Sequence, residues 1–384
     1  MSFERLAEFQ DGLEKIGIGG NDCAVYLDGK PVYRHFSGWQ DRERGIRINE
    51  NTLYRMFSMT KPITCTAALQ LLEQGKILLA DPLSDYLPEY ANMKVQSPVA
   101  FGDCAIRPAQ NPIRIQNLFE MTAGLDYETY TPAIRELIKE TDGKFTTRQY
   151  AAALAKAPLH FEPGTHWLYS QAHDVLGALI EVVSGESFQE YLRNHIFAPL
   201  GIETGWFHEP ECERSRLCRR YGLDADGNWM IGSEVNNLQH SPNFCSGGAG
   251  LVMTVDDYAK FAIAMTNRGK SHDGARILNG RTVDMMRTAR LNEAELKDFT
   301  AYEQRWGYSY GLGVRTMVDT AAGGSLSTVG EFGWGGAWGT YVAMDPDAKV
   351  TIVYAEQGVD TKGVYIQRRL RNLAYAALDE EGLL

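Results

Sequence analysis

Strand-like patterns of apolar and polar residues lie near both ends of the chain. Two short runs, 22–27 (DCAVYL) and 31–36 (PVYRHF), flank a D-G-K turn signal and predict a β-hairpin. A second hairpin is predicted over 340–357, where TYVAMDPDAKVTIVYAEQ turns at D-P-D-A. The spacing over 365–378 predicts a helix after it. Strands therefore gather at the two termini.

Apolar residues return at helical spacing over 3–16, and again over 58–75, where Gly75 is placed to end the helix. Helical periodicity and loops dominate from about residue 82 to 300, with Pro, Gly and Ser or Asn bounding most of the helices. The clearer helices predicted there cover 147–156, 172–184, 187–196, 256–267 and 280–287.

The economical arrangement of these elements is an α+β fold. One antiparallel sheet, flanked by helices, would be built from both ends of the chain. We expect residues 1–82 and 301–384 to form this α/β domain and residues 83–300 to form a mainly helical domain, with the active site between them.

Composition and charge limit the class of partner. The chain has 384 residues, is 44% hydrophobic and 23% charged, and carries a formal net charge of −11. These values are typical of a folded globular protein and argue against nucleic acid as a partner, because phosphate binding needs a basic surface. We see no membrane span and no secretory signal, and the six cysteines show no paired spacing, so we expect a cytoplasmic protein of open oligomeric state.

Several familiar catalytic motifs are missing from the sequence. It has no G-x-S-x-G, no H-E-x-x-H and no G-x-x-x-x-G-K-[ST], and its glycine-rich segments do not match G-x-G-x-x-G. We therefore expect neither a metal nor a cofactor.

The motif that remains is S-x-x-K, which occurs once, as Ser58 and Lys61 in FSMTK. On a helix this spacing places both side chains on one face. The start of a helix also favours a developing anion, so the backbone N–H of Ser58 could help to hold an oxyanion. Alone, the motif is weak, since a capping serine and a surface lysine show the same letters.

Five blocks in order strengthen this interpretation: YRMFSMTK (54–61), DPLSDYLPE (81–89), FEPGTHWLYS (161–170), GGAGLVMTVDDYAKF (247–261) and GWGGAWGTYVA (333–343). Together they resemble the serine β-lactamase and penicillin-binding-protein superfamily, and within it class C β-lactamases and family VIII carboxylesterases. The resemblance covers most of the chain and implies a β-lactamase-like fold and a serine hydrolase with no cofactor.

The resemblance implies that Ser58 is the nucleophile and Lys61 the neighbouring amine. It also implies a tyrosine from a Y-x-N motif that shuttles the proton. Tyr90 matches this motif letter for letter, whereas Tyr169 is followed by Ser and Gln. We favour Tyr169, because F-x-P-G precedes it and a helix follows it as in the family. Whether the lysine or the tyrosine is the general base stays open.

The third family element, K-T-G or H-x-G on an edge strand, is replaced here by Trp334, Gly335 and Gly336. W-x-G at this place resembles the family VIII esterases. The resemblance implies that the backbone N–H of Ala337 pairs with that of Ser58 in an oxyanion hole.

Two departures from the family bear on the substrate. Trp334 removes the cation that in the family helps to bind a carboxylate, and Gln171 is one methylene longer than the family's Asn, which contacts an acyl-amide carbonyl. Both favour a neutral ester over an anionic β-lactam. Tyr127 and Phe244 are further candidates to line the pocket.

The histidines do not suggest a Ser-His-Asp triad. His166, His173, His208 and His240 stand in no recognisable setting, and His272 in H-D-G belongs to a polar turn rather than a strand. The leading hypothesis is thus a carboxylesterase acting on a small-molecule ester through an acyl-enzyme. The alternatives are a β-lactamase, a D-amino-acid peptidase or amidase, an acyltransferase, and a non-catalytic penicillin-binding-like sensor.

Overall fold

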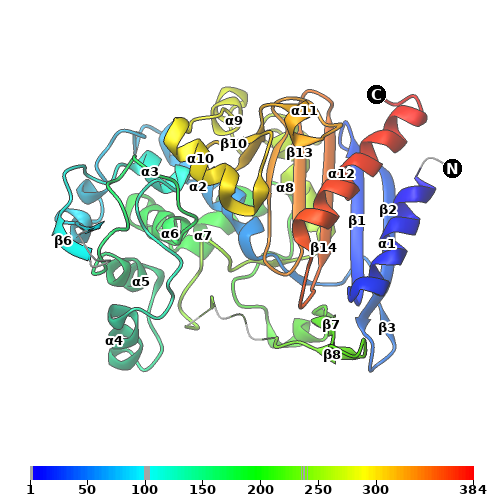
Figure 1. The fold of residues 1–384 in the computed structure, drawn as a ribbon, viewed down its shortest axis with the longest axis horizontal. Helices are drawn as coiled ribbons and strands as arrows, with labels where there is room; N and C mark the ends of the chain where they lie inside the picture. Colours follow the sequence, from blue (N-terminus) through cyan, green and yellow to red (C-terminus); the bar gives the residue numbers. More distant parts are fainter. Residues whose placement is uncertain (1–2, 99–103, 235, 237, 240) are drawn as a thin grey trace.

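Both ends of the chain meet in one antiparallel sheet (Figure 1). A computed structural model describes residues 3–98, 104–234, 236, 238–239 and 241–384. Over these residues the sheet has eight strands in the order β10-β11-β12-β13-β14-β1-β2-β3. Their bounds are β10 Tyr308–Tyr310, β11 Arg315–Met317, β12 Phe332–Gly335, β13 Tyr341–Asp345, β14 Val350–Glu356, β1 Gly20–Leu27, β2 Lys30–Asp41 and β3 Ile46–Arg47.

Both predicted hairpins are confirmed, and they join each other in the middle of the sheet. In β1 and β2, Val25 pairs with Tyr33, and Ile352 of β14 pairs with Ala343 of β13. The same Ile352 lies opposite Val25 across the β1–β14 pairing. The α+β fold expected from the sequence is therefore correct.

Side chains alternate between the two faces of the sheet, as the two-residue period of a strand requires. In β13, Tyr341 and Ala343 join one hydrophobic cluster, whereas Val342 and Met344 join another. The first cluster contains residues of α1 (Glu4–Gly12) and α12 (Gly363–Glu380), which lie side by side on one face (Figure 1). Both faces are covered, so the central strands are apolar along their length.

Helix α8 (Val255–Thr266) covers the opposite face and packs against β13, β14 and β1. It comes from within 83–300, the range predicted to form a separate helical domain. The proposed division of the chain into two domains stays a prediction, and α8 is the part of that range that lies on the sheet.

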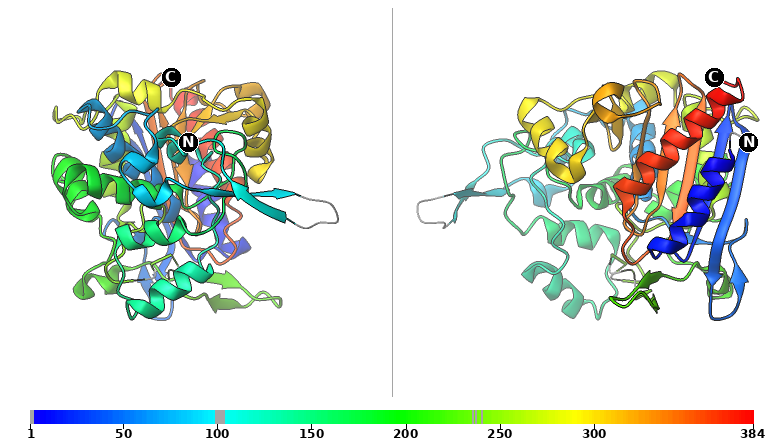
Figure 2. Two further views of the ribbon diagram at one scale, coloured as in Figure 1. Left: turned by 90° about the vertical axis from the view of Figure 1, so that its left-hand side faces the viewer. Right: turned by 45° about the vertical axis from the view of Figure 1, so that its right-hand side comes forward.

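The remaining helices lie beside the sheet and around α2 (Thr60–Glu73) (Figure 2). Helix α2 packs against α6, and α6 packs against α5. The predicted helices are confirmed within a few residues at their ends, and α7 is continued by a π-helical turn, Arg193–Phe197. The other bounds are α3 Ile115–Glu120, α4 Pro132–Glu140, α5 Thr147–Leu154, α6 Ala172–Ser184, α7 Phe188–Leu192, α9 Gly280–Met286, α10 Glu293–Ala301 and α11 Thr320–Gly323.

Among the described residues, three short two-stranded pairings accompany the main sheet, and the hairpin of β5 and β6 extends from the body of the molecule (Figure 2). Over the described residues, no helix combines the length and apolarity needed to cross a bilayer. The strands of these pairings are β4 Tyr54–Arg55 with β9 Val252–Met253, β5 Lys94–Pro98 with β6 Cys104–Pro108, and β7 Tyr221–Leu223 with β8 Trp229–Ile231.

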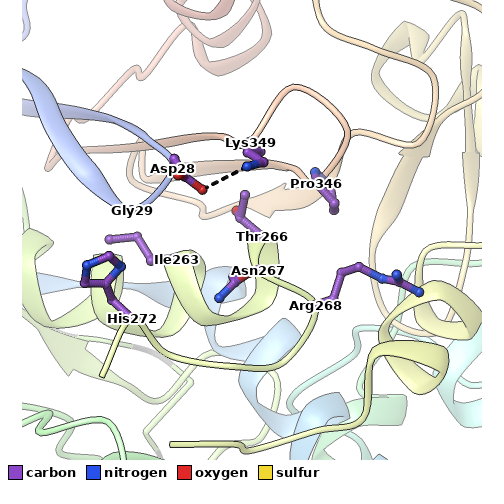
Figure 3. Close-up of a pocket in the computed structure, with 9 residues that line it drawn as sticks. All are labelled: Asp28, Gly29, Ile263, Thr266, Asn267, Arg268, His272, Pro346 and Lys349. Atoms are coloured by element: carbon purple, nitrogen blue, oxygen red, sulfur yellow. Dashed lines mark ion pairs between the residues drawn. The ribbon is translucent and has the colours of Figure 1, made fainter. Parts of the chain in front are cut away.

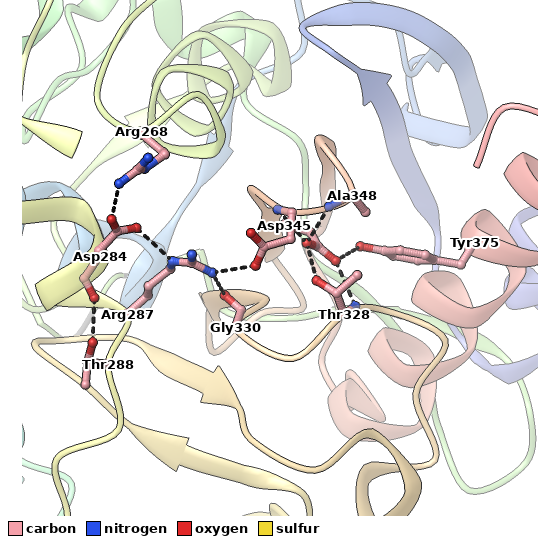
Figure 4. Close-up of polar contacts among 10 residues, drawn as sticks. Arg268, Asp284, Arg287, Thr288, Thr328, Gly330, Asp345, Ala348 and Tyr375 are labelled. Atoms are coloured by element: carbon pink, nitrogen blue, oxygen red, sulfur yellow. Dashed lines mark hydrogen bonds and ion pairs between the residues drawn. The ribbon is translucent and has the colours of Figure 1, made fainter. Parts of the chain in front are cut away.

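A buried carboxylate ties α12 to the turn that follows β13 (Figure 4). Asp345 is 0% exposed and accepts hydrogen bonds from the hydroxyls of Thr328 (2.6 Å) and Tyr375 (2.6 Å) and from the N–H of Ala348 (3.1 Å). These donors compensate the cost of burying the carboxylate. They fix the end of β13 and, with it, the turn that leads to β14.

Candidate active site

Ser58 lies in a single 3₁₀ turn, Phe57–Met59, directly before α2. Phe57 has a φ of +46°, an unfavourable conformation for a residue with a side chain, and its ring packs against Trp338 with 4.5 Å between centroids. Such strained backbone is concentrated at functional sites. The turn holds the Ser58 side chain at the wall of a cavity, with 8% of the residue exposed.

Lys61 is fully buried beside the serine. Its Nζ donates to Ser58 Oγ at 3.2 Å, to Tyr127 Oη at 3.0 Å and to the Gly248 carbonyl at 2.8 Å. These three contacts hold the amine nitrogen against the serine hydroxyl. The S-x-x-K spacing therefore brings the two side chains together as the sequence predicted.

Tyr169 also lies beside the serine and Lys61. Its hydroxyl accepts a hydrogen bond from Trp334 Nε1 at 3.0 Å, and Lys61 Nζ is 4.6 Å from the centre of its ring. Burial raises the pKa of the phenol, and hydrogen bonds with Ser58 and Trp334 oppose this only in part. Tyr169 is therefore a neutral hydroxyl near neutral pH, in contact with Ser58.

The competing tyrosine, Tyr90, has a structural role. It ends a 3₁₀ turn, Pro88–Tyr90, is 3% exposed and donates its hydroxyl hydrogen to the carbonyl of Ala151 at 2.7 Å. Tyr90 is not among the residues that line the cavity at Ser58. Tyr90, the tyrosine that matches Y-x-N letter for letter, therefore lies outside the site.

The strand predicted to carry the third element forms the opposite wall. A Cβ on Gly336 would lie 2.1 Å from Thr340 Oγ1 and 2.3 Å from the Met56 carbonyl, so only glycine fits between them. Within the described part of the chain, the backbone N–H of the next residue, Ala337, has no acceptor. Ala337 lines the same cavity as Ser58, where its N–H is free to bind an oxyanion.

The cavity at Ser58 has a volume of about 250 Å³. It brings together the predicted residues Ser58, Tyr169, Trp334, Gly335, Gly336 and Ala337. The sequence reasoning missed a second set, which comes from the loop before β10 and from the start of α12. These residues are Tyr302, Glu303, Arg305, Thr361, Gly363, Val364 and Gln367. They belong to no motif, and only the folded chain places them here.

Three predicted pocket residues, Gln171, Phe244 and Tyr127, do not line this cavity. Gln171 is 2% exposed, and its amide is held by the hydroxyl of Tyr150 (2.5 Å) and the carbonyl of Glu128 (3.1 Å). Phe244 is 1% exposed and packs against the Tyr150 ring. Both were placed at the pocket by sequence position, which does not tell where a side chain points. Tyr127, by contrast, bonds to Lys61.

Asp174 and Ser246 position the backbone of Gly248, whose carbonyl holds Lys61. Asp174 Oδ1 accepts from Ser246 Oγ at 2.6 Å and from the Gly248 N–H at 3.2 Å. Burial raises the pKa of Asp174, and these hydrogen bonds and the charge of Lys61 oppose the effect. A Cβ on Gly248 would lie 2.9 Å from Asp174 Oδ2, which explains the glycine.

Three of the four histidines considered as catalytic partners make other contacts, and His240 lies outside the described residues. His166 Nδ1 contacts Asp298 at 2.8 Å, His208 Nε2 contacts the carbonyl of Phe244 at 3.0 Å, and His173 is buried beside Cys65. A search of the described residues for three or more His, Cys, Asp or Glu side chains able to hold a metal finds no such group.

His272 lines a separate cavity of about 210 Å³ at the turns of the sheet (Figure 3). An ion pair between Asp28 and Lys349 (3.3 Å) forms one side of it, and Arg268 stands at the end of α8. This cavity shares none of its lining residues with the cavity at Ser58. The H-D-G letters therefore do not belong to the site, as expected from the polar turn.

The buried His173 gives a prediction for stability. Burial, with the charge of Lys61, lowers the pKa of His173 to about 3, whereas an unfolded histidine has a pKa of about 6.5. Below pH 6.5 the unfolded chain takes up a proton that the folded chain does not, so stability falls as pH falls, by about 1.4 kcal/mol per pH unit from this group. Urea unfolding of wild type and His173→Gln at pH 6.5 and 4.5 measures how far the free energy of unfolding falls between the two pH values. We expect this fall to be about 2–3 kcal/mol larger in wild type than in His173→Gln. Equal losses in the two proteins would contradict a neutral buried His173.

Comparison with known proteins agrees with this geometry. The Beta-lactamase family model matches residues 7–376. Protein Rv1367c of Mycobacterium tuberculosis is 31% identical over 83% of this chain and 81% of its own length. Esterase EstB of Burkholderia gladioli is 29% identical over 87% of this chain and 84% of its own length. The solved structure of "EstCE1, a hydrolase with promiscuous acyltransferase activity" superposes with a TM-score of 0.80. It is 26% identical to this chain, and the match covers 97% of this chain and 98% of EstCE1.

The fold, the buried Ser–Lys pair and these relatives define a serine hydrolase. The chain belongs to the Beta-lactamase family, near the family VIII carboxylesterases.

Proposed function

We propose that this protein hydrolyses carboxylic esters through an acyl-enzyme on Ser58. The observation that carries the proposal is the contact of 3.2 Å between Lys61 Nζ and Ser58 Oγ, at the wall of a cavity that also contains the Tyr169 hydroxyl. A serine is a weak nucleophile unless a neighbouring group accepts its proton. Lys61 and Tyr169 are the groups in position to do so.

The steps follow from these positions. Ser58 Oγ bonds to the ester carbonyl carbon while its proton passes to the Lys61–Tyr169 pair, whose two groups titrate together; the pair accepts it in the form that holds one proton, as neutral amine with phenol or as ammonium with phenolate, and then holds two. The N–H groups of Ser58 and Ala337 hold the oxyanion. The bond to the leaving oxygen then breaks, and Tyr169, kept protonated by its raised pKa, donates a proton to it. Water enters by the same steps in reverse and releases the acid.

Two observations favour esters over β-lactams as substrates. They are the residue that replaces the K-T-G lysine and the names of the relatives. Trp334 stands where the family carries the lysine of K-T-G, and its indole N–H bonds to Tyr169. EstB is named an esterase, and EstCE1 is titled a hydrolase with promiscuous acyltransferase activity. Acyl transfer to an alcohol is the second candidate, since the alcohol would take the place of water in the last step.

Intact-mass spectrometry tests the proposal directly. The protein is mixed with short-chain p-nitrophenyl esters, with the matching anilides and with nitrocefin, and quenched after one turnover. We expect an added acyl mass from the esters in wild type and none in Ser58→Ala. Repeating the ester reaction with added butanol distinguishes hydrolysis from acyl transfer by the product. Rapid acylation by nitrocefin, with none by esters, would overturn the assignment.

A further inference from the structure

An arginine lines the cavity beside the catalytic tyrosine. The guanidinium carbon of Arg305 lies 4.3 Å from the centre of the Trp334 ring and 5.6 Å from that of Tyr302. The side chain is 12% exposed, and one terminal nitrogen forms an ion pair with Glu303. Its Nε is buried and has no hydrogen-bond partner within the described residues. The other terminal nitrogen, Nη1, makes no hydrogen bond to the described residues, and it is the donor that Arg305 can offer to a ligand in the cavity.

Further arginines lie close to Arg305, around a second cavity that Arg305 also lines. A smaller cavity, of about 20 Å³, shares four lining residues with the cavity at Ser58: Glu303, Arg305, Val364 and Gln367. Three more arginines line it, namely Arg315, Arg368 and Arg371, and we call these with Arg305 the arginine cluster.

The cluster is not neutralised by its surroundings. Arg315 and Arg371 are 3% and 2% exposed, and both keep buried N–H groups without a partner among the described residues. Glu331, fully buried, pairs with Arg315 at 2.9 Å. With Glu303 this makes two carboxylates for four guanidinium groups. Burial, together with the neighbouring Arg371 and Arg305, lowers the pKa of Arg368.

The mechanism indicates which part of a substrate meets this charge. Tyr169 protonates the leaving oxygen, so that oxygen must lie within hydrogen-bond reach of the phenol. The ring of Tyr169 packs against Trp334 and Tyr302, with centroids 5.5 and 5.3 Å apart, and both rings contact Arg305. Whatever continues beyond the leaving oxygen therefore runs toward Arg305.

We propose that the site selects esters whose alcohol portion carries a carboxylate, bound by Arg305 in the positive field of the arginine cluster. This inference rests on the proposed esterase function and names its substrate class. It departs from the expectation of a neutral ester, because a cation in place of the K-T-G lysine would be supplied from a different segment of the chain.

Glu303 competes with such a substrate for Arg305. Glu303 and Gln304 both have φ of +53°, a costly conformation for two consecutive residues with side chains. The strained loop keeps the Glu303 carboxylate on Arg305 Nη2 and leaves Nη1 without a hydrogen bond to the described residues. Neutralising Glu303 should strengthen binding of a carboxylate, and neutralising Arg305 should weaken it.

Two esters with the same acyl group test the proposal: 3-(butanoyloxy)propanoate and its neutral isostere 3-(butanoyloxy)propanamide. We expect wild type to prefer the carboxylate in kcat/KM by at least tenfold, the effect of a charge-assisted contact. The ratio should fall by at least tenfold in Arg305→Gln and rise several-fold in Glu303→Gln. Arg268→Gln, at the separate cavity, is the matched control and should keep the wild-type ratio. A ratio near one in wild type, or one that Arg305→Gln leaves unchanged, would overturn the proposal.

Binding separates this inference from the esterase assignment. Calorimetry with Ser58→Ala measures the affinity of 3-hydroxypropanoate, the alcohol product, without any turnover. We expect binding that is at least tenfold weaker in Ser58→Ala/Arg305→Gln, even if neither ester is cleaved. The same titration in chloride and in gluconate at equal ionic strength identifies the source of the anion. Thermal stabilisation by chloride with no binding of 3-hydroxypropanoate would mean a free-anion site and would overturn the substrate proposal.

Discussion

Replacing Ser58 with alanine should lower kcat for p-nitrophenyl butyrate by about four to six powers of ten, the loss found when a serine nucleophile is removed. The side chain lies at the cavity wall in contact with Lys61 and is the only hydroxyl placed at once beside Lys61, Tyr169 and the free N–H of Ala337 among the described residues. Initial rates with purified protein measure the effect.

The control for this variant is Ser184→Ala on α6. Ser184 donates to the carbonyl of Ile180 at 2.6 Å and lies outside the cavity, so its variant should keep the wild-type rate. Circular dichroism of both variants checks that the fold is retained. Wild-type turnover by Ser58→Ala would exclude the acyl-enzyme mechanism.

Tyr169→Phe should lower kcat by about two to four powers of ten, the range for removing a general acid or base. In the proposed mechanism the phenol is the proton donor to the leaving group, and no other hydroxyl bonds to Trp334 Nε1 among the described residues. Tyr127→Phe is a matched comparison, because its ring stacks on Tyr169 at 5.4 Å and its hydroxyl also contacts Lys61, yet it does not line the cavity. We expect a loss of about tenfold or less there.

The pH–rate profiles of the two tyrosine variants add a second measurement. Loss of the Tyr169 hydroxyl should remove a limb of the profile, since the titrating pair loses one member. Equal losses in both variants, or a larger loss in Tyr127→Phe, would transfer the proton-shuttle role to Tyr127.

The periodic elements of the fold were predictable because each carries its own signal. Alternation with a turn marked β1 and β2, and the D-P-D-A turn marked β13 and β14. Strands β10 and β11 are only three residues each, too short for a period to be recognised, and their place at the sheet edge depends on pairing with β12. The amphipathic pattern of α8 predicts a buried face, but it does not tell which element that face packs against. The packing of α8 on the sheet was therefore not predictable.

The candidate site divides in the same way. Ser58 and Lys61 are close in the sequence, so helical spacing alone predicts that their side chains meet. Gln171 was misplaced because its neighbour Tyr150 captures the amide, a contact between separate helices. Arg305 was missed because a lone arginine in a loop carries no signal until the fold brings it onto Trp334.

The pairing of β1 with β14 sets the order in which the site can be completed during synthesis. Ser58 leaves the ribosome early, but Trp334, Ala337 and the start of α12 come from the last segment of the chain, and β1 has no partner on that side until β14 is made. Contacts between such distant segments form slowly, because a long loop must close first. A nascent chain thus contains the serine and the lysine long before it contains Trp334 and Ala337, and the cavity at Ser58 is complete only after the start of α12 has been made.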